Sequence, residues 1–274
     1  MSRQEIVIRA NSKSNLIDFV ELWNYRDLLF FLVLRSFKVK YAQSILGVGW
    51  AVIQPLVATL IFTIIFGRVA KVSSDGVPYF LFSLCAMVPW NYFSNTLTDS
   101  TNSLVQNTNM LSKVYFPRIV LPLAAVFSKL LDFLIGLVLL IIMIAIYEFP
   151  FSWNVLLLPL LIIVLLLNSL GLGLWLSAMA IQYRDVKHAM TFLVQFLMYL
   201  APVVYPTSNI PEDYRLIYAI NPMVGVIEGF RSIFLNTGPM PWTYLGIGFV
   251  VSLVIFLLGI LYFKKAERHF ADVA

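Results

Sequence analysis

The sequence is poor in charged residues and has almost no cysteine. Charged residues make up 12% of the 274 positions and hydrophobic residues 60%, whereas soluble domains carry about 25% charged residues. The single cysteine, Cys85, excludes an internal disulfide and argues against a thiol-rich metal site. This composition is typical of an integral membrane protein.

Motifs that bind nucleotides or metals are also absent from the sequence. There is no G-x-x-x-x-G-K-[ST] loop, and His188 and His269 lie outside any H-E-x-x-H context. Gly171-x-Gly173 lacks the third glycine of a dinucleotide fingerprint and lies in an apolar run, which favours close helix packing. We find no nucleophile–base or carboxylate pair placed for catalysis. The chain is expected to be no enzyme and to hold no cofactor, metal or nucleic acid.

The N-terminal 46 residues carry seven Lys or Arg side chains and no signal-peptide pattern. We therefore expect an uncleaved chain whose N-terminus stays in the cytosol. Within this part, segment 16–41 joins a short apolar run to basic residues, which predicts an amphipathic helix in the membrane interface. Arg35, Lys38 and Lys40 are candidates to hold a lipid headgroup or a substrate phosphate. The alternative is that they only fix the topology.

Six apolar segments are candidates to cross a hydrocarbon core of about 30 Å. They are 47–66, 77–95 with an interruption at Pro89, 119–147, 153–181, 188–204 and 242–263. Segment 205–241 holds five prolines and only short apolar pieces, which predicts short re-entrant helices. The expected fold is an all-α integral membrane protein with six transmembrane helices. Its parts are a cytosolic tail and interface helix (1–46), a transmembrane domain (47–263) and a cytosolic tail (264–274).

Lys and Arg are distributed unequally between the two faces of this topology. Segments 1–46, 102–118, 182–187 and 264–274 together hold fourteen, and the opposite face holds four: Arg68, Lys71, Arg215 and Arg231. Positive residues gather on the cytosolic side of membrane proteins. Both termini and the connectors 102–118 and 182–187 are therefore predicted to be cytosolic.

Only Lys129 and Asp132 place charge inside a predicted span. They lie one helical turn apart, which predicts an ion pair on one helix face, with a proton relay as the alternative. Because charge is otherwise absent from the spans, an ion-coupled flippase is disfavoured and energy for transport would come from a separate subunit.

Aromatic residues reach 15% of the chain. Aromatic faces suit the C–H faces of sugar rings, so those within spans or in the proline-rich segment are candidates for a glycan path, with ordinary packing and lipid contact as the alternative. The candidates are Tyr79, Phe82, Phe196, Tyr199, Tyr218 and Phe230.

The longest polar interruption in the first two thirds of the chain is the connector 102–118. Met110, Leu111, Val114 and Tyr115 fall at i, i+1, i+4 and i+5, an apolar stripe that suits a groove on a soluble partner. Lys113 and Arg118 would pair with acidic residues of that partner or with lipid phosphates.

Several segments together carry a resemblance to a known family. The chain resembles the permease subunit of bacterial ABC exporters for polysaccharides, which move lipid-linked O-antigen or capsular polymer across the inner membrane. The matching segments are 26–28 (RDL), 34–49 (LRSFKVKYAQSILGVG), Trp50, 54–56 (QPL), 111–118 (LSKVYFPR), 183–186 (YRDV) and 221–223 (NPM).

The resemblance implies a homodimer of six-span subunits joined to two copies of an ATPase subunit, which holds the ATP and Mg²⁺. It implies a multi-pass protein of the bacterial inner membrane whose substrate is an undecaprenyl-diphosphate-linked polysaccharide. It also implies that the two cytosolic connectors are coupling elements. The candidate coupling residues are Met110, Leu111, Lys113, Val114, Tyr115, Phe116, Arg118, Tyr183, Arg184 and Asp185.

Other functions share parts of this pattern. One is an ABC permease for teichoic acid, a drug or a small lipid. Another is a membrane glycosyltransferase, which needs acidic residues in cytosolic loops to hold a metal-bound nucleotide sugar. Asp99 and Asp185 are a thin supply for that chemistry.

Overall fold

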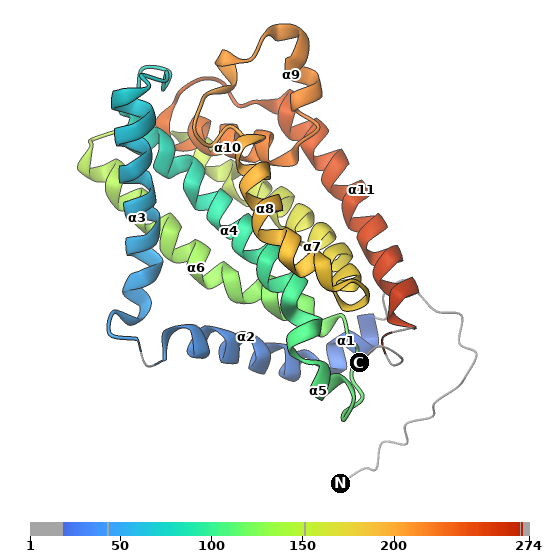
Figure 1. The fold of residues 1–274 in the computed structure, drawn as a ribbon. Helices are drawn as coiled ribbons and strands as arrows, with labels where there is room; N and C mark the ends of the chain where they lie inside the picture. Colours follow the sequence, from blue (N-terminus) through green and yellow to red (C-terminus); the bar gives the residue numbers. More distant parts are fainter. Residues whose placement is uncertain (1–18, 43, 151, 269, 271–274) are drawn as a thin grey trace.

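The computed structural model describes residues 19–42, 44–150, 152–268 and 270. Residues 1–18 of the predicted N-terminal part (1–46) and 271–274 of the predicted C-terminal tail (264–274) therefore lie outside the described residues. Every regular element of the described part is helical (Figure 1). The elements are α1 (Phe19–Asn24), α2 (Arg26–Tyr41), η1 (Gly47–Gly49), α3 (Trp50–Phe62), η2 (Thr63–Val69), α4 (Tyr79–Gln106), α5 (Thr108–Leu111), α6 (Val120–Ile146), η3 (Trp153–Leu157), α7 (Leu158–Gln182), α8 (Arg184–Tyr199), η4 (Thr207–Asn209), α9 (Glu212–Tyr218), α10 (Pro222–Leu235) and α11 (Trp242–Glu267).

Four helical stretches of the described chain are long and apolar enough to cross a membrane. They are Gly47–Val69, Val120–Ile146, Trp153–Gln182 and Trp242–Glu267, and they coincide with the first, third, fourth and sixth predicted spans. α4 and α8 occupy the places of the other two predicted spans. α4 has a polar second half, and α8, with 16 residues, is only about 24 Å long.

The structure corrects two expectations about α4. Pro89 does not interrupt the helix, which runs unbroken for 28 residues, although a proline removes one backbone donor. The residues on either side of Pro89 are fully packed, with Val88 and Trp90 each 3% exposed. This packing keeps the backbone helical through Pro89. The helix also extends to Gln106, so the first five residues of the predicted connector 102–118 belong to it.

The predicted connector 182–187 is likewise mostly helical. Only Tyr183 has an extended backbone, and α8 starts at Arg184 with Asp185 in its first turn. A carboxylate there is favoured by the positive end of the helix dipole. Polar residues at a helix start resemble loop residues in a sequence, which explains the error.

Two apolar clusters hold the helices together. The larger contains residues of α4, α6, α7, α8, α10 and α11 and includes half of α10. The smaller joins the end of α4, the segment before α6, the end of α7 and the end of α11 to α2, through residues such as Leu32, Leu104 and Phe116. α2 therefore lies across the lower ends of the long helices (Figure 1), and its place in a membrane interface stays a prediction.

α7 and α11 approach each other at glycines. A Cβ on Gly171 would lie 2.6 Å from the backbone nitrogen of Phe256, and a Cβ on Gly259 would collide with the carbonyl of Gly171. This confirms the interpretation of Gly171 as a helix-packing residue. Gly173 is also close-packed, with its Cβ position 3.0 Å from Ser100 of α4.

The proline-rich segment between α8 and α11 forms the short elements η4, α9 and α10 at the upper end of the molecule (Figure 1). α10 begins with an asparagine cap, since the side chain of Asn221 accepts a hydrogen bond from the N–H of Met223 at 3.1 Å. It also carries Arg231, which is fully buried and pairs with Glu228 at 2.9 Å.

Candidate functional site

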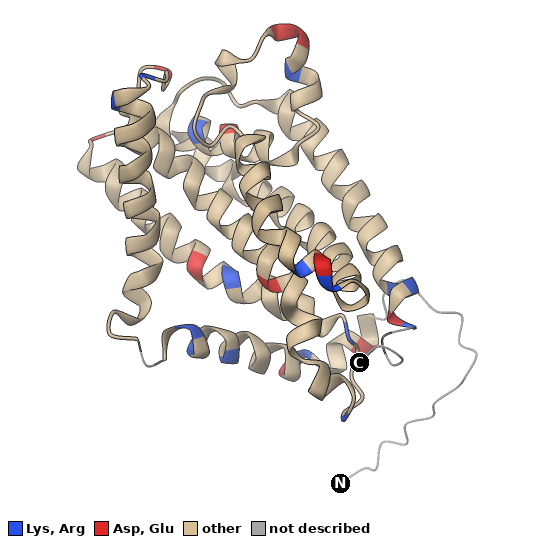
Figure 2. Ribbon diagram, in the orientation of Figure 1, with Lys and Arg blue, Asp and Glu red and all other residues tan. Residues whose placement is uncertain are grey.

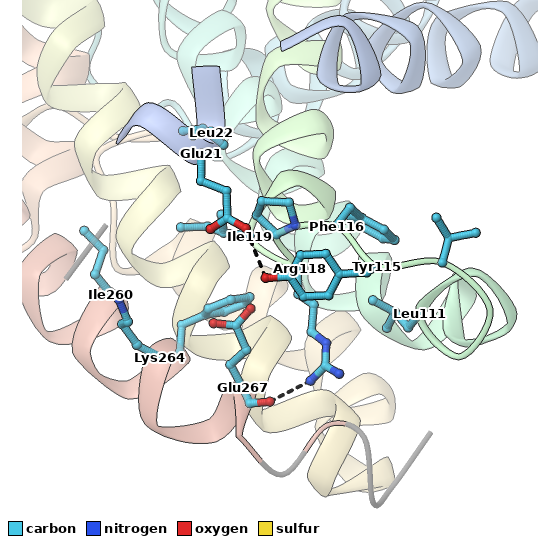
Figure 3. A pocket seen from close by; sticks show the side chains of 13 residues that line it. Glu21, Leu22, Leu111, Tyr115, Phe116, Arg118, Ile119, Ile260, Lys264 and Glu267 are labelled. Carbon is cyan, nitrogen blue, oxygen red and sulfur yellow. Dashed lines mark hydrogen bonds between the residues drawn. The ribbon is translucent and has the colours of Figure 1, made fainter. Parts of the chain in front are cut away.

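The end of the molecule that carries α2 has a cavity of about 340 Å³ between α1, the segment after α5 and the last turns of α11 (Figure 3). Predicted coupling residues line it together with Glu21, Lys264 and Glu267. The first and last described helices therefore meet at this end, and the connector lies between them.

The candidate coupling residues of this connector divide by exposure. Lys113, Val114 and Tyr115 are exposed, whereas Phe116 is 4% exposed and belongs to the lower apolar cluster. Met110 and Leu111 are partly buried against the same cluster. The expected continuous stripe does not form, because the helix ends at Leu111 and the backbone turns.

Tyr115 attaches the connector to α1. Its hydroxyl donates to Oε1 of Glu21 at 3.1 Å, and the hydroxyl of Tyr25 donates to its carbonyl oxygen at 3.4 Å. Partial burial, and then the hydrogen bond to Glu21, raise the pKa of Tyr115. The ring nevertheless remains 78% exposed, so it presents an aromatic face beside Val114.

Arg118 attaches the connector to α11. Its Nη1 donates to the carbonyl oxygen of Glu267 at 2.6 Å, and its guanidinium lies 5.7 Å from the ring of Phe270. A helix C-terminus attracts cations, so this contact fixes the start of α6 to the end of α11.

The second connector also contacts α11. The hydroxyl of Tyr262 donates to the side chain of Gln182 at 3.5 Å, while Tyr183, Arg184 and Asp185 are exposed. One helix, α11, therefore touches both candidate coupling segments.

The basic residues of α2 do not act alike. Arg35 and Lys38 are exposed, but Nζ of Lys40 lies 2.6 Å from Asp132 of α6, which also accepts the Tyr41 hydroxyl at 2.5 Å. Partial burial, followed by the bond to Asp132, raises the pKa of Tyr41.

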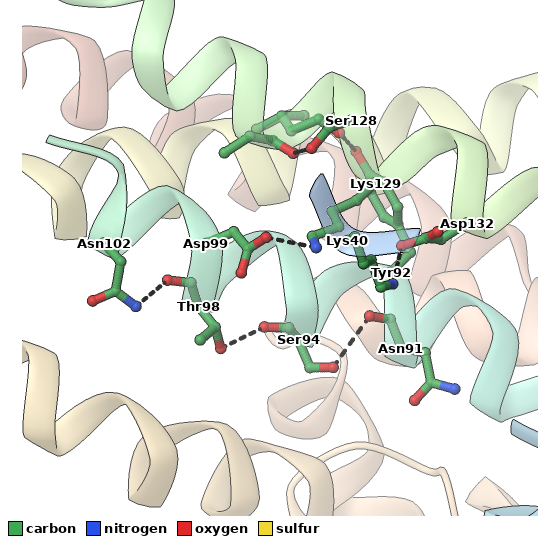
Figure 4. A network of polar contacts seen from close by, with 12 residues as sticks. Lys40, Asn91, Tyr92, Ser94, Thr98, Asp99, Asn102, Ser128, Lys129 and Asp132 are labelled. Atoms are coloured by element: carbon green, nitrogen blue, oxygen red, sulfur yellow. Dashed lines mark hydrogen bonds and ion pairs between the residues drawn. The ribbon is translucent and has the colours of Figure 1, made fainter. Parts of the chain in front are cut away.

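The expected ion pair between Lys129 and Asp132 is wrong. Lys129 pairs instead with Asp99 of α4 at 2.5 Å, and Asp132 pairs with Lys40 (Figure 4). Each residue finds a partner on another helix, which the spacing along α6 could not reveal. Figure 2 shows acidic and basic positions on the parts of α4 and α6 that lie toward α2.

The candidate glycan-path aromatics separate into buried and exposed groups. Phe82 and Phe230 are fully buried in the core, and Tyr79 is 8% exposed with its hydroxyl donating to the carbonyl of Val204. Tyr218 is partly buried, with its hydroxyl 3.1 Å from that of Tyr205. Of the six candidate aromatics, only Phe196 and Tyr199, both on α8, are exposed.

These two aromatics belong to a longer stripe on α8 that sequence reasoning missed. Polar and aromatic side chains alternate along one exposed face of this helix, at the i, i+3, i+4, i+7 spacing of a single helix side. This α8 stripe consists of His188, Thr191, Phe192, Gln195, Phe196 and Tyr199. The spacing is present in the sequence, but the prediction of a span at 188–204 includes only Phe196 and Tyr199 as glycan-path candidates.

The family model of the ABC-2 type transporter matches residues 27–235, from the start of α2 to the end of α10. The chain belongs to the ABC-2 type transporter family. It is accordingly a multi-pass protein of the inner membrane.

Three relatives of this ABC-2 transporter chain align along most of its length. The chain is 27% identical to the O-antigen export system permease protein RfbA of Klebsiella pneumoniae, over 90% of this chain and 95% of the relative. It is 29% identical to the RfbA protein of Myxococcus xanthus, over 78% and 82%. It is 24% identical to the polysialic acid transport protein KpsM of Escherichia coli, over 86% and 92%.

Proposed function

We propose that this chain is the membrane subunit of an ATP-driven exporter that moves a polysaccharide of the O-antigen or capsular type across the bacterial inner membrane. The observation that carries the proposal is the alignment of nearly the whole chain with export permeases for such polymers. The α8 stripe supports it, since aromatic faces beside polar groups suit sugar rings better than lipid tails.

The finer parts of the proposal concern topology and partners. Two copies of the chain, each with six spans and both termini in the cytosol, would assemble with two copies of an ATPase subunit. The short elements η4, α9 and α10 would be re-entrant from the outer face. The convergence of α1, the connector and the end of α11 at one pocket supports a shared cytosolic side for both ends. The proposed parts remain 1–46, 47–263 and 264–274.

The energy would reach the membrane through the two connectors. Movement of the ATPase against Lys113, Val114 and Tyr115, and against Tyr183 to Asp185, would be passed to α11 by the contacts at Glu267 and Tyr262. The substrate would be linked to undecaprenyl diphosphate, and the basic end of α2 supports recognition of that group.

The test is transport by purified components. The chain and its ATPase are reconstituted into vesicles, and ATP-dependent movement of labelled lipid-linked polysaccharide is measured against labelled teichoic acid precursor and small lipids. Movement of the polysaccharide alone is the expected result. Transport of only the other substrates, or transport without ATP, would contradict the proposal.

A further inference from the structure

A second cavity, of about 240 Å³, lies between α2, α3, α4 and α6 beside the ion pairs of Figure 4. Apolar residues such as Val88 and Phe133 form part of its wall. Charged and amide side chains from all four helices form the rest: Lys40, Gln54, Asn91, Asn95, Lys129 and Asp132. We call it the α2–α6 pocket.

The lining of this pocket is rich in hydrogen-bond donors and carries excess positive charge. Lys40 and Lys129 contribute two ammonium groups, but only one carboxylate, Asp132, lines the same space. Asp99, which balances Lys129, lines a neighbouring cavity of about 300 Å³ on the other side. Ammonium groups and amide N–H₂ groups together suit an anion with several oxygen atoms.

Each of the two ammonium groups pairs with a carboxylate. The side chain of Lys129 is 12% exposed and that of Lys40 is 33% exposed. Asp132 contacts both Lys40 and the Tyr41 hydroxyl, as a bound phosphate oxygen would. An anion that enters the pocket must therefore compete with Asp132 for Lys40.

We propose that the α2–α6 pocket binds the diphosphate group of the transported lipid and that Asp132 occupies this site when the lipid is absent. This rests on the proposed function, which supplies a diphosphate-bearing substrate. Arg35 lines the neighbouring cavity of about 300 Å³, and Lys38 is exposed two positions before Lys40, a spacing at which two helix side chains do not face each other.

Binding has a consequence for the helices, because Lys129 and Asp132 lie one turn apart on α6. When the diphosphate takes Lys40, Asp132 loses its cation, and Lys129 is the nearest replacement on the same helix face. Lys129 then leaves Asp99. A single ligand therefore opens the two ion pairs that tie α2 and α4 to α6, and α4 and α6 keep only their apolar packing and the Tyr92 hydrogen bond at this position.

The experiment measures binding by the full-length chain in nanodiscs of phosphatidylcholine, with farnesyl diphosphate as the probe. The Lys40→Gln variant should weaken binding by about tenfold or more, since it removes a charge-assisted hydrogen bond. The Asp132→Asn variant should strengthen binding by several-fold, since it removes the competitor. Lys265→Gln, which changes an exposed lysine of α11 outside this pocket, is the matched control and should change binding little.

The two variants are expected to change the affinity for the probe in opposite directions, which distinguishes a ligand site from a structural ion pair. If Lys40→Gln and Asp132→Asn both weaken binding, or neither changes it, the inference is wrong. Asp99→Asn is a second variant in case Asp132→Asn does not fold, and it should also strengthen binding because it frees Lys129. Melting temperatures of all variants identify those that fold.

Two further arms identify the source of the phosphate. Inorganic pyrophosphate should compete with the probe, whereas phosphatidylglycerol at the same concentration should not. Equal competition by phosphatidylglycerol would overturn the assignment to the diphosphate and indicate a general lipid headgroup site. Polymer export by the wild-type chain is measured separately, so export without these binding effects defeats only this inference, and diphosphate binding without export defeats only the proposed function.

Discussion

Gly171 of α7 lies directly against the backbone of α11. Its Cβ position lies 2.6 Å from the backbone nitrogen and 2.7 Å from the Cα of Phe256, and backbone atoms cannot rotate away as a side chain can. Gly171→Ala should therefore destabilise the chain by about 1–3 kcal/mol, the usual cost of overpacking, and lower its melting temperature in detergent by several degrees. Gly246→Ala on α11, with nothing within 4 Å of its Cβ position, is the control and should leave the melting temperature unchanged. Equal melting temperatures for both variants would contradict this account.

The pair Arg231 and Glu228 allows a second prediction about single residues, which concerns the stability cost of a buried charge. The Arg231 side chain is fully buried over the ring of Phe82, with its guanidinium carbon 3.5 Å from the ring centroid, and Glu228 is 12% exposed. Glu228→Gln leaves the buried cation without its partner, which costs about 3–5 kcal/mol. The double variant Glu228→Gln with Arg231→Met should recover part of this loss.

A matched exposed pair provides the comparison. Arg215 and Glu212 have the same i, i+3 spacing, but the Glu212 side chain is 87% exposed, so Glu212→Gln should cost about 1 kcal/mol or less. Chemical or thermal unfolding of the four proteins measures the difference. If the double variant is less stable than Glu228→Gln alone, the unpaired buried cation is not the cause of the stability loss in Glu228→Gln.

At the scale of elements, the four long apolar helices could be predicted from the sequence because hydrophobic length alone defines them. α4 could not be bounded in this way. Its second half is polar, yet Ser100, Thr101 and Ser103 are buried, and Thr101 and Ser103 donate their hydroxyls to carbonyls within the same helix. A helix that buries so many polar side chains resembles a loop by composition. The ion-pair partners of Lys129 and Asp132 could not be predicted either. They lie on other helices, α4 and α2, and spacing within one helix does not reveal contacts between helices.

The connector between α4 and α6 gives the prediction at this scale. Val114 and Tyr115 are 60% and 78% exposed while Phe116 is buried, so the part of this connector that we propose to dock on the ATPase is the turn after α5. Tyr115→Glu should weaken association with the ATPase by about tenfold or more, since an interfacial tyrosine contributes about 2 kcal/mol at a hot spot. Copurification and ATP-dependent export measure the loss.

Two other substitutions control for general damage. Tyr214→Glu alters a tyrosine of α9 that is 62% exposed at the other end of the molecule, and it should leave ATPase association intact. Phe116→Glu should lower the folded yield, because it places a charge in the lower apolar cluster. If Tyr115→Glu copurifies with the ATPase as well as wild type does, the coupling role of this turn is wrong.

At the scale of the whole molecule, the α8 stripe needs a partner. A helix of 16 residues that exposes Thr191 and Gln195 beside Phe192 and Phe196 is poorly matched to lipid tails, which cannot hydrogen-bond these groups. The second copy in the proposed dimer would cover the stripe, with the polymer passing between the two copies. In a two-fold dimer a residue near the axis faces its own equivalent.

Cysteine cross-linking tests this arrangement, and the sequence is suited to it because the native Cys85 is fully buried. Phe196→Cys in membranes should give a cross-linked dimer with a short bifunctional maleimide, since each copy would present its thiol to the other across the polymer path. Val250→Cys is the control, because Val250 is 59% exposed on α11, away from the stripe, and should remain monomeric on a denaturing gel. Bound lipid-linked polymer should reduce the Phe196→Cys cross-link by filling the space between the two thiols. Cross-linking through Val250→Cys in preference to Phe196→Cys would place the dimer interface on α11 and remove α8 from the path.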